Sequence, residues 1–289
     1  MEIAIVLQAL INGLMMAGLY MVIGMGFGIV YGVGEIVNLA HGDLVMISMY
    51  IVFWIYSLYR WDPFIISPLI ACIMFGVGVL VYFYFRPLMK KQSSSFTYFV
   101  VTMALSIILQ NLAQIIWSAN YRSILTSYAL TSISIGNINI PTVLFITFII
   151  SLNIILLLSV FLKFTDLGRA IRAVSQNEQL AYIVGINVDR IRCFSIGISS
   201  ALAGIAGCCV ITFSYVYPTI GSNWLITCFQ LVVLSGMGNF WGIPLAALIL
   251  SEVYCFTTLF LPLYFGPIIS AIIFLLMLII KPQGLLTRD

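Results

Sequence analysis

The sequence predicts an all-α protein that crosses a membrane several times, as a bundle of eight to nine transmembrane helices with a cytoplasmic helix-turn-helix. Three observations support this fold class. The chain of 289 residues is 63% hydrophobic and 7% charged, against roughly 25% charged in ordinary soluble domains. Its apolar runs are about 20 residues long, the length that crosses a bilayer as a helix. One segment, residues 163–192, holds eight of the 21 charged side chains (12 basic and 9 acidic).

Nine apolar runs are candidate spans. Backbone amides in lipid have no water to bond, and continuous runs without strict alternation exclude a β-barrel, so each span must be a helix. The first run opens with Glu2 rather than a basic region and is too long for a signal peptide, so we expect it to remain as the first span. The candidates are residues 4–31, 43–59, 64–85, 96–118, 142–162, 193–217, 222–237, 242–260 and 265–280.

The basic residues predict the orientation of these spans. Ten of the 12 follow the third, fifth and ninth spans, and only Arg60 and Arg122 fall on the other side. Basic connections stay in the cytoplasm, so the N-terminus is expected outside. The stretch before Glu35 and the short run after Ser222 are the weakest spans, and either is a candidate broken or re-entrant helix. Eight full crossings therefore remain an alternative to nine.

The connection over residues 120–141 contains ISIGNINI, two alternating runs joined by Gly136 and Asn137. This pattern favours a small external β-hairpin, with a disordered loop as the alternative. No polar stretch exceeds about 30 residues, too few to bury a core of its own. Residues 1–289 are therefore expected to form a single domain.

Missing motifs exclude several function classes. No lysine follows a glycine, so the chain lacks the loop that cradles nucleotide phosphates. His41 is the only histidine, with Asp43 its nearest acid, which argues against a metal site. Ser235 lacks the preceding glycine of a nucleophile elbow, since Val233 stands there. We expect no catalytic residue and no metal, and the net charge of +3 requires no nucleic-acid partner.

The charged segment itself predicts two short helices. Leu167, Ala170, Ile171 and Val174 have the spacing of one apolar helix face, and the remaining positions are basic or polar. The side chains expected to point away from that face are Arg169, Arg172 and Gln176.

Capping patterns define the second helix. Ser175 and Glu178 have capping-box spacing, and Gly185 can end the helix in a left-handed conformation. Asn187 or Asp189 can cap the following span. Spacing alone leaves two interpretations open: this surface binds a partner, or it lies on the membrane interface or packs under the bundle.

The residues of this segment carry a resemblance. GRAIRAVSQNEQLAYIVGIN, residues 168–187, resembles the cytoplasmic coupling loop of the branched-chain amino acid ABC-transporter permeases, the LivH/LivM family. Four more segments are similar to that family in order along nearly the whole chain. They are the opening pattern of Gln8, Asn12, Gly13 and Tyr20; NLAHGD at 38–43; LVVLSGMGNFWG at 231–242; and KPQGL at 281–285.

The sequence departs from the family pattern at several positions. Ser48-Met49-Tyr50 replaces the frequent Gly-Ala-Tyr, Ala104 stands where glycine is common, and Asp166 where a basic residue is usual. These departures bear on the substrate rather than on the family.

The resemblance implies the permease subunit of an ABC importer that moves branched-chain or other hydrophobic amino acids across the cytoplasmic (inner) membrane. Its implied partners are a second homologous permease, two cytoplasmic ABC ATPases and an extracytoplasmic substrate-binding protein. The chain would bind no cofactor, because ATP and Mg belong to the partner ATPases. Urea or short-chain amides are the alternative cargo within the family.

The resemblance also implies which residues transmit the motion of the ATPases. We expect bulky replacements of Gly168 or Ala181 to leave the protein folded but to uncouple ATP hydrolysis from uptake. The implied coupling residues are Leu167, Gly168, Arg169, Ala170, Arg172, Ala173, Gln176, Asn177, Ala181, Gly185 and Asn187.

Polar residues at membrane depth are costly unless they face a partner or water, so they are candidates for the translocation pathway. His41 and Asp43 have a structural alternative, because they can satisfy backbone groups freed by a break. Glu252 is expected near the pore or the partner permease, and it is also the residue that an ion-coupled carrier would use. The candidates are Asn12, Asn38, His41, Gln110, Asn111, Gln114 and Glu252.

Small residues recur every fourth position in two of the spans. Gly24, Gly28 and Gly32 form one stripe, and Ser199 and Gly207 belong to the other. No GxGxxG motif surrounds them, so close helix packing is the preferred interpretation over dinucleotide binding.

Overall fold

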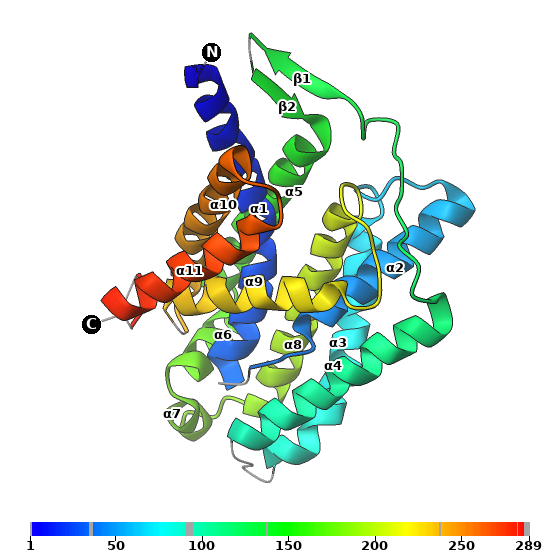
Figure 1. The fold of residues 1–289 in the computed structure, drawn as a ribbon. Coiled ribbons are helices and arrows are strands. Elements are labelled where there is room, and N and C mark those ends of the chain that lie inside the picture. Colours follow the sequence, from blue (N-terminus) through cyan, green and yellow to red (C-terminus); the bar gives the residue numbers. More distant parts are fainter. Residues whose placement is uncertain are drawn as a thin grey trace.

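The computed structural model describes residues 2–34, 37–90, 95–136, 138–236, 238–281 and 283–285. These residues form a helical bundle with one two-stranded sheet (Figure 1). The long helices are α1 (Glu2–Gly34), α2 (His41–Tyr59), α3 (Ser67–Lys90), α4 (Ser95–Trp117), α5 (Thr142–Phe164), α8 (Val188–Val210), α9 (Ile220–Ser235), α10 (Ile243–Phe260) and α11 (Phe265–Ile280). The short elements are α6 (Asp166–Gln176), α7 (Glu178–Ile183) and the 3-10 turn η1 (Phe240–Gly242).

Length and composition identify the membrane-crossing helices. Seven helices among the described residues are long and apolar enough to span a bilayer: α1, α2, α3, α4, α5, α8 and α10, the last together with η1. Helices α9 and α11 have 16 residues each. They are therefore about 24 Å long, shorter than the roughly 30 Å hydrocarbon core. The protein is a helical polytopic membrane protein.

One predicted span is wrong at both ends. The run 193–217 was expected to be helical, but α8 covers Val188–Val210. Its first turn includes charged residues because Asn187 caps the helix through the Arg190 amide. Beyond it, Val216 forms an isolated antiparallel bridge with Arg122 instead of continuing the helix. Apolar composition alone did not separate the helix from the apolar connection after it.

The two ends of the bundle differ in charge. Helix α10 runs antiparallel to α1, because Gly28 of α1 faces Ile243 whereas Gly13 faces Glu252. The end of α3 with Arg86 lies near Asp189 and Arg192 at the start of α8. At the same end, the Leu285 amide donates to the Leu234 carbonyl (2.8 Å). The three basic connections thus share one end, although Lys91 and Arg288 lie outside the described residues.

The opposite end carries the predicted β-hairpin. Strands β1 (Ser132–Ile135) and β2 (Ile138–Pro141) pair antiparallel, with Ile133 opposite Ile140. Gly136 has φ +62°, which suits the tight turn, whereas Asn137 lies outside the described residues. Gln8 of α1 holds β2: its Nε2 donates to the Asn139 carbonyl (2.6 Å) and its Oε1 accepts from the Asn139 amide (2.7 Å).

The small-residue stripes pack helices together, as predicted. A Cβ on Gly24 would lie 2.9 Å from Ile243 Cγ2, and one on Gly32 would lie 2.7 Å from Phe240 Cζ. A Cβ on Gly207 would lie 2.9 Å from the Val45 carbonyl. Side chains at these positions would force α1 away from α10 and α8 away from α2.

Helices α2 and α9 begin inside the bundle rather than at its surface. His41, the first residue of α2, contacts Gly26 of α1, which lies eight residues before the end of that helix, or about 12 Å along it. A Cβ on Gly42 would lie 2.8 Å from the Leu225 amide in α9. The alternative of a broken helix in the stretch before Glu35 does not hold for the described residues, because α1 is continuous to Gly34. Figure 1 shows α9 lying across α1 instead of alongside it.

Candidate functional site

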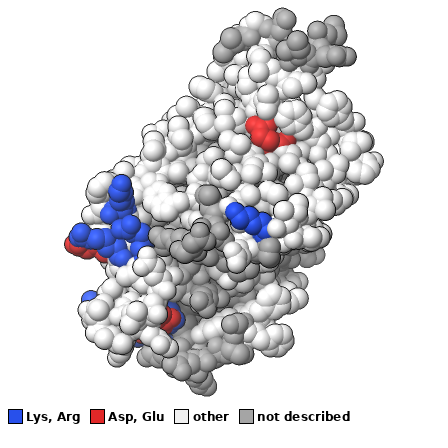
Figure 2. Space-filling model, turned by 90° about the vertical axis from the view of Figure 1, so that its left-hand side faces the viewer, with Lys and Arg blue, Asp and Glu red and all other residues white. Residues whose placement is uncertain are grey.

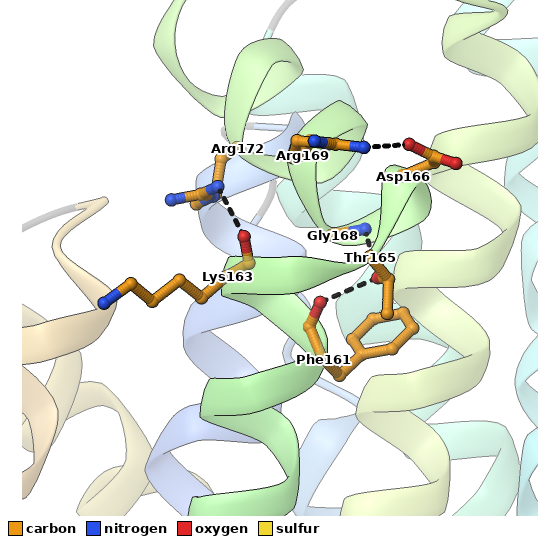
Figure 3. Close-up of polar contacts among 7 residues, drawn as sticks. All are labelled: Phe161, Lys163, Thr165, Asp166, Gly168, Arg169 and Arg172. Carbon is orange, nitrogen blue, oxygen red and sulfur yellow. Dashed lines mark hydrogen bonds and ion pairs between the residues drawn. The ribbon is translucent and has the colours of Figure 1, made fainter.

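The segment between α5 and α8 begins with a capping residue that the sequence reasoning missed. The Thr165 hydroxyl accepts from the Gly168 amide (3.0 Å) and donates to the Phe161 carbonyl (2.7 Å) (Figure 3). One side chain therefore caps the start of α6 and binds the last turn of α5. The signal for it was Thr165 immediately before the first helical residue.

Helix α6 lies against the end of α5 through glycine. A Cβ on Gly168 would lie 2.6 Å from Leu162 Cα, too close for any side chain. Ile171 and Val174 are buried on the same face, whereas Leu167, predicted to belong to it, is exposed, and Ala170 is half-buried. The expectation that a bulky residue at 168 leaves the structure intact is wrong, because the backbone of α5 occupies that space.

The polar side of α6 is held by local contacts. Arg169 forms an ion pair with Asp166 one turn earlier, and Arg172 donates to the Lys163 carbonyl (3.4 Å) (Figure 3). Arg169 and Gln176 are exposed, and Arg172 and Ala173 are half-buried. These contacts orient α6 relative to the end of α5.

Helix α7 is capped at both ends. Asn177 accepts from the Leu180 amide (2.9 Å), so the predicted capping residue Ser175 is wrong; its hydroxyl donates to the Arg172 carbonyl instead (2.9 Å). Gly185 has φ +87° and ends the helix in the predicted left-handed cap. The Gly185 amide donates to the Tyr182 carbonyl (3.0 Å), and the Ile186 amide donates to the Ala181 carbonyl (3.0 Å). This pair of hydrogen bonds is a Schellman motif.

Helix α7 presents an exposed apolar surface, and the buried residue Ala181 fixes the helix against the rest of the protein. Ala181 is 3% exposed, so a bulky residue there would also displace the helix rather than only alter its surface. Glu178 pairs with Arg192 of α8 at 2.5 Å. A groove of about 940 Å³ lies between α7 and the start of α8. We call the exposed apolar residues of this segment the α7 patch: Leu180, Tyr182, Ile183 and Val184.

The charge distribution sets this end apart. Figure 2 shows a face of the molecule that is mostly uncharged, with its Lys and Arg in separate groups at mid-height and below, and an acidic group above them. The exposed apolar residues of α7 lie outside the spans, beside a groove whose charged residues are Glu178, Asp189 and Arg192, and such a surface is suited to binding another protein.

The structure does not bring the candidate pathway residues together. Asn38 accepts from the Ala40 amide (3.1 Å) and so shapes the turn before α2. His41 is fully buried, with Nδ1 3.3 Å from the Ser199 hydroxyl and its ring edge-on to Phe27 at 5.6 Å. Asn38 thus binds a backbone amide before α2, whereas His41 packs at the start of α2 and its Nε2 is buried without a hydrogen-bond partner among the described residues.

The three candidates on α4 face different surroundings. Gln110 Nε2 donates to Asp43 Oδ1 (3.0 Å) and to the Ser222 hydroxyl (3.3 Å), linking α4 to α2 and α9. Asn111 and Gln114 are exposed, and the Asn111 amide donates to the Ile107 carbonyl of its own helix (2.7 Å). Only Gln110 points into the bundle.

Glu252 and Asn12 lie in the half of the bundle that carries the hairpin. Glu252 faces the glycine at position 13, where a Cβ would lie 2.5 Å from its carboxyl carbon. Its Oε2 is buried without a hydrogen-bond partner among the described residues. Asn12 Oδ1 accepts from Gln8 Nε2 (3.1 Å).

A cavity of about 270 Å³ lies between α1, α9, α10 and α11, and Gln230 lines it. Gln230 was not among the candidates chosen from the sequence. It meets the criterion used for Gln110, a polar side chain inside an apolar run, so the sequence could have identified this residue. The cavity is lined by Met16, Tyr20, Ile220, Asn223, Trp224, Ile226, Thr227, Gln230, Leu250, Tyr254, Pro267 and Ser270.

Metal binding finds no support in the described part of the chain. Nowhere in residues 2–285, apart from the gaps given above, do three or more His, Cys, Asp or Glu side chains come together. The buried acid Asp43 bonds the Gln110 amide and the Ser106 hydroxyl.

The fold defines a multi-pass helical membrane protein. The family model described as branched-chain amino acid transport system / permease component matches residues 9–281. The chain therefore belongs to the family of branched-chain amino acid transport permeases.

Individual relatives agree with the family model. The chain is 26% identical to the high-affinity branched-chain amino acid transport system permease protein LivH of Salmonella typhimurium, over 98% of this chain and 96% of the relative. It is 26% identical to BraD of Pseudomonas aeruginosa, a protein of the same description, over 99% and 97%. A probable LivM of Methanocaldococcus jannaschii is 29% identical over 50% of this chain and 45% of its own length. No solved structure gives a significant match.

Proposed function

We propose that residues 1–289 form a single permease domain of an ABC importer, which moves branched-chain or other hydrophobic amino acids across the cytoplasmic membrane. ATP hydrolysis in two partner ATPases would drive the movement. The observation that carries the proposal is the α7 patch, an exposed apolar surface on a helix with a cap at each end. Such a helix can be pushed without unfolding, as a coupling element requires.

The contacts of α6 support a route for this push into the bundle. Its first turn is joined to α5 through Thr165. Near its last turn, a Cβ on Gly32 of α1 would lie 3.7 Å from Ser175 Cβ, beside Phe240 of η1. A displacement of α6 would thus reach α5, the end of α1 and the turn that follows α9. We propose α6 and α7 as the segment that transmits ATPase motion.

The remaining partners follow from the surfaces of the bundle. A second permease of the family would complete the pathway, and the hairpin end would face an extracytoplasmic binding protein. We propose eight or nine crossings: nine if the short helices α9 and α11 both cross fully, and eight if only one of them does. The chain itself would bind neither ATP nor Mg.

The test uses the complete transporter in liposomes, with ATP-driven leucine uptake as the readout. Ile183 is 76% exposed, so Ile183→Asp should leave folding unchanged but abolish uptake and leucine-stimulated ATP hydrolysis, since a charge would be buried against the ATPase. The control is Leu130→Asp, an apolar position at the hairpin end that is 88% exposed, which should keep ATP hydrolysis coupled. Uptake driven by an ion gradient without ATP, or full activity of Ile183→Asp, would refute the proposal.

A further inference from the structure

The cavity between α1, α9, α10 and α11 is closed towards the end of the bundle that carries α6 and α7. Its residues on α1, Met16 and Tyr20, lie two turns and one turn towards the hairpin end from Gly24. Gly24 is in contact with α9, where a Cβ would lie 3.1 Å from Leu231 Cδ1. Helix α9 therefore separates the cavity from the end that carries α6 and α7.

Polar groups in the wall of this cavity are left without partners. Gln230 and Tyr20 are each 7% exposed, and neither side chain forms a hydrogen bond with another described residue. Unpaired polar groups are costly inside a protein unless water or a ligand binds them. Gln230 comes from α9 and Tyr20 from α1, so one bound molecule would satisfy groups from two helices.

The chemistry of the wall narrows the class of ligand. No Asp, Glu, Lys or Arg lines the cavity, so a ligand with net charge would be left unpaired at membrane depth. The Tyr20 hydroxyl and the Gln230 side-chain NH2 group can donate to a carboxylate, and the Gln230 carbonyl oxygen accepts from an ammonium group. Ile220, Ile226, Leu250 and Pro267 supply apolar surface for an aliphatic side chain.

The volume sets the size of the ligand. The cavity measures about 270 Å³, just below the roughly 300–1,000 Å³ of sites for drug-sized ligands. It can hold one small molecule and excludes a peptide. We propose that this cavity is a binding site for a single zwitterionic amino acid with an aliphatic side chain, held in the hairpin half of the bundle above α9. The choice of ligand class rests on the proposed function.

The proposal is tested with the full-length chain in lipid nanodiscs and a small thiol-specific reagent. In Met16→Cys the new thiol lies in the cavity wall on α1, at a position with no assigned role in binding, and the unmodified chain gives the background from its six cysteines. Leucine at about ten times its dissociation constant should slow labelling about tenfold. Arginine and glutamate should leave the labelling rate unchanged.

Two further variants complete the design. Thr227→Cys places the thiol on α9, where the native hydroxyl bonds only the Asn223 carbonyl of its own helix, so the measurement survives if Met16→Cys fails to fold. Ser214→Cys lies in the connection between α8 and α9, outside the cavity lining, and leucine should not protect it. Protection by acetamide but not by leucine would overturn the amino-acid assignment. Absence of protection by either compound would overturn the site itself.

The outcome separates this inference from the proposed function. ATP-driven uptake of leucine by the complete transporter is measured in parallel. ATP-driven uptake without protection of the thiols by leucine would refute the proposed binding site and leave the importer function unaffected. Protection by leucine without ATP-driven uptake would support the binding site and refute the importer function.

Discussion

Gln110 of α4 donates a hydrogen bond to the buried carboxyl group of Asp43 in α2, across 3.0 Å. Gln110 also reaches Ser222 in the first turn of α9. The glycine beside it, Gly221, packs directly on Asp43. Helix α4 is otherwise a peripheral helix with mostly exposed side chains. This one amide therefore joins α4 to the place where α2 and α9 begin inside the bundle.

Replacing Gln110 by Leu should lower stability. The substitution leaves a buried carboxyl oxygen with one partner fewer, at a cost of about 1–3 kcal/mol. The measurement is the thermal unfolding midpoint of the purified chain in detergent. Asn111→Leu is the matched control, because Asn111 is exposed and bonds only its own helix. Equal midpoints for the two variants would show that the link to Asp43 does not fasten α4.

Gly168→Val should destabilise the segment between α5 and α8. The added side chain would enter space held by the backbone of Leu162, and overpacking of this kind costs typically about 1–3 kcal/mol. Limited proteolysis should then cut within residues 163–187 faster than in the unmodified chain. Gly76→Val serves as control, since a Cβ on Gly76 has no atom within 4 Å. Unchanged proteolysis of the Gly168 variant would contradict the packing described for α6.

Local features of the fold were predictable because they depend on local chemistry. Among the described residues each predicted apolar run contains a helix, although α8 is displaced from the predicted run 193–217, and strands β1 and β2 pair as their alternation indicated. The left-handed cap at Gly185 was also correct, since glycine tolerates positive φ. The predicted capping residue of α7, in contrast, was wrong. Ser175 and Asn177 are both good caps, and only the path of the chain after α6 selects Asn177.

The direction in which a side chain points was the part that sequence could not supply. Membrane depth made Gln110, Asn111 and Gln114 equal candidates, yet α4 turns only Gln110 inwards. Gln230 was overlooked although it lines the cavity. Periodicity likewise assigned Leu167 to the apolar face of α6, whereas close contact at Gly168 rotates that face away from it. These choices depend on the neighbouring helix, which periodicity does not specify.

The stability of the hairpin end should fall at alkaline pH through Tyr128. Burial raises the pKa of this phenol above its ordinary value of 10.0, and the hydrogen bond it donates to Asp62 (2.6 Å) raises it further. Below pH ~10 both folded and unfolded chains keep the proton, so stability is independent of pH. Above it the unfolded chain loses the proton first, which favours unfolding. Thermal midpoints between pH ~8 and ~11 should fall less steeply for Tyr128→Phe; parallel curves would exclude Tyr128 as the cause.

Gln8→Ala should release the hairpin from α1. The Gln8 amide bonds both backbone groups of Asn139, much as a neighbouring strand would, and so protects the outer edge of β2. Without it the Asn139 amide should exchange with deuterium about five- to tenfold faster, the equivalent of roughly 1 kcal/mol. Gln114→Ala, which removes an exposed glutamine from α4, should leave exchange in residues 132–141 unchanged. Equal exchange in both variants would mean that the hairpin is ordered by its own pairing, such as Ile133 with Ile140, and that α1 contributes nothing to its position.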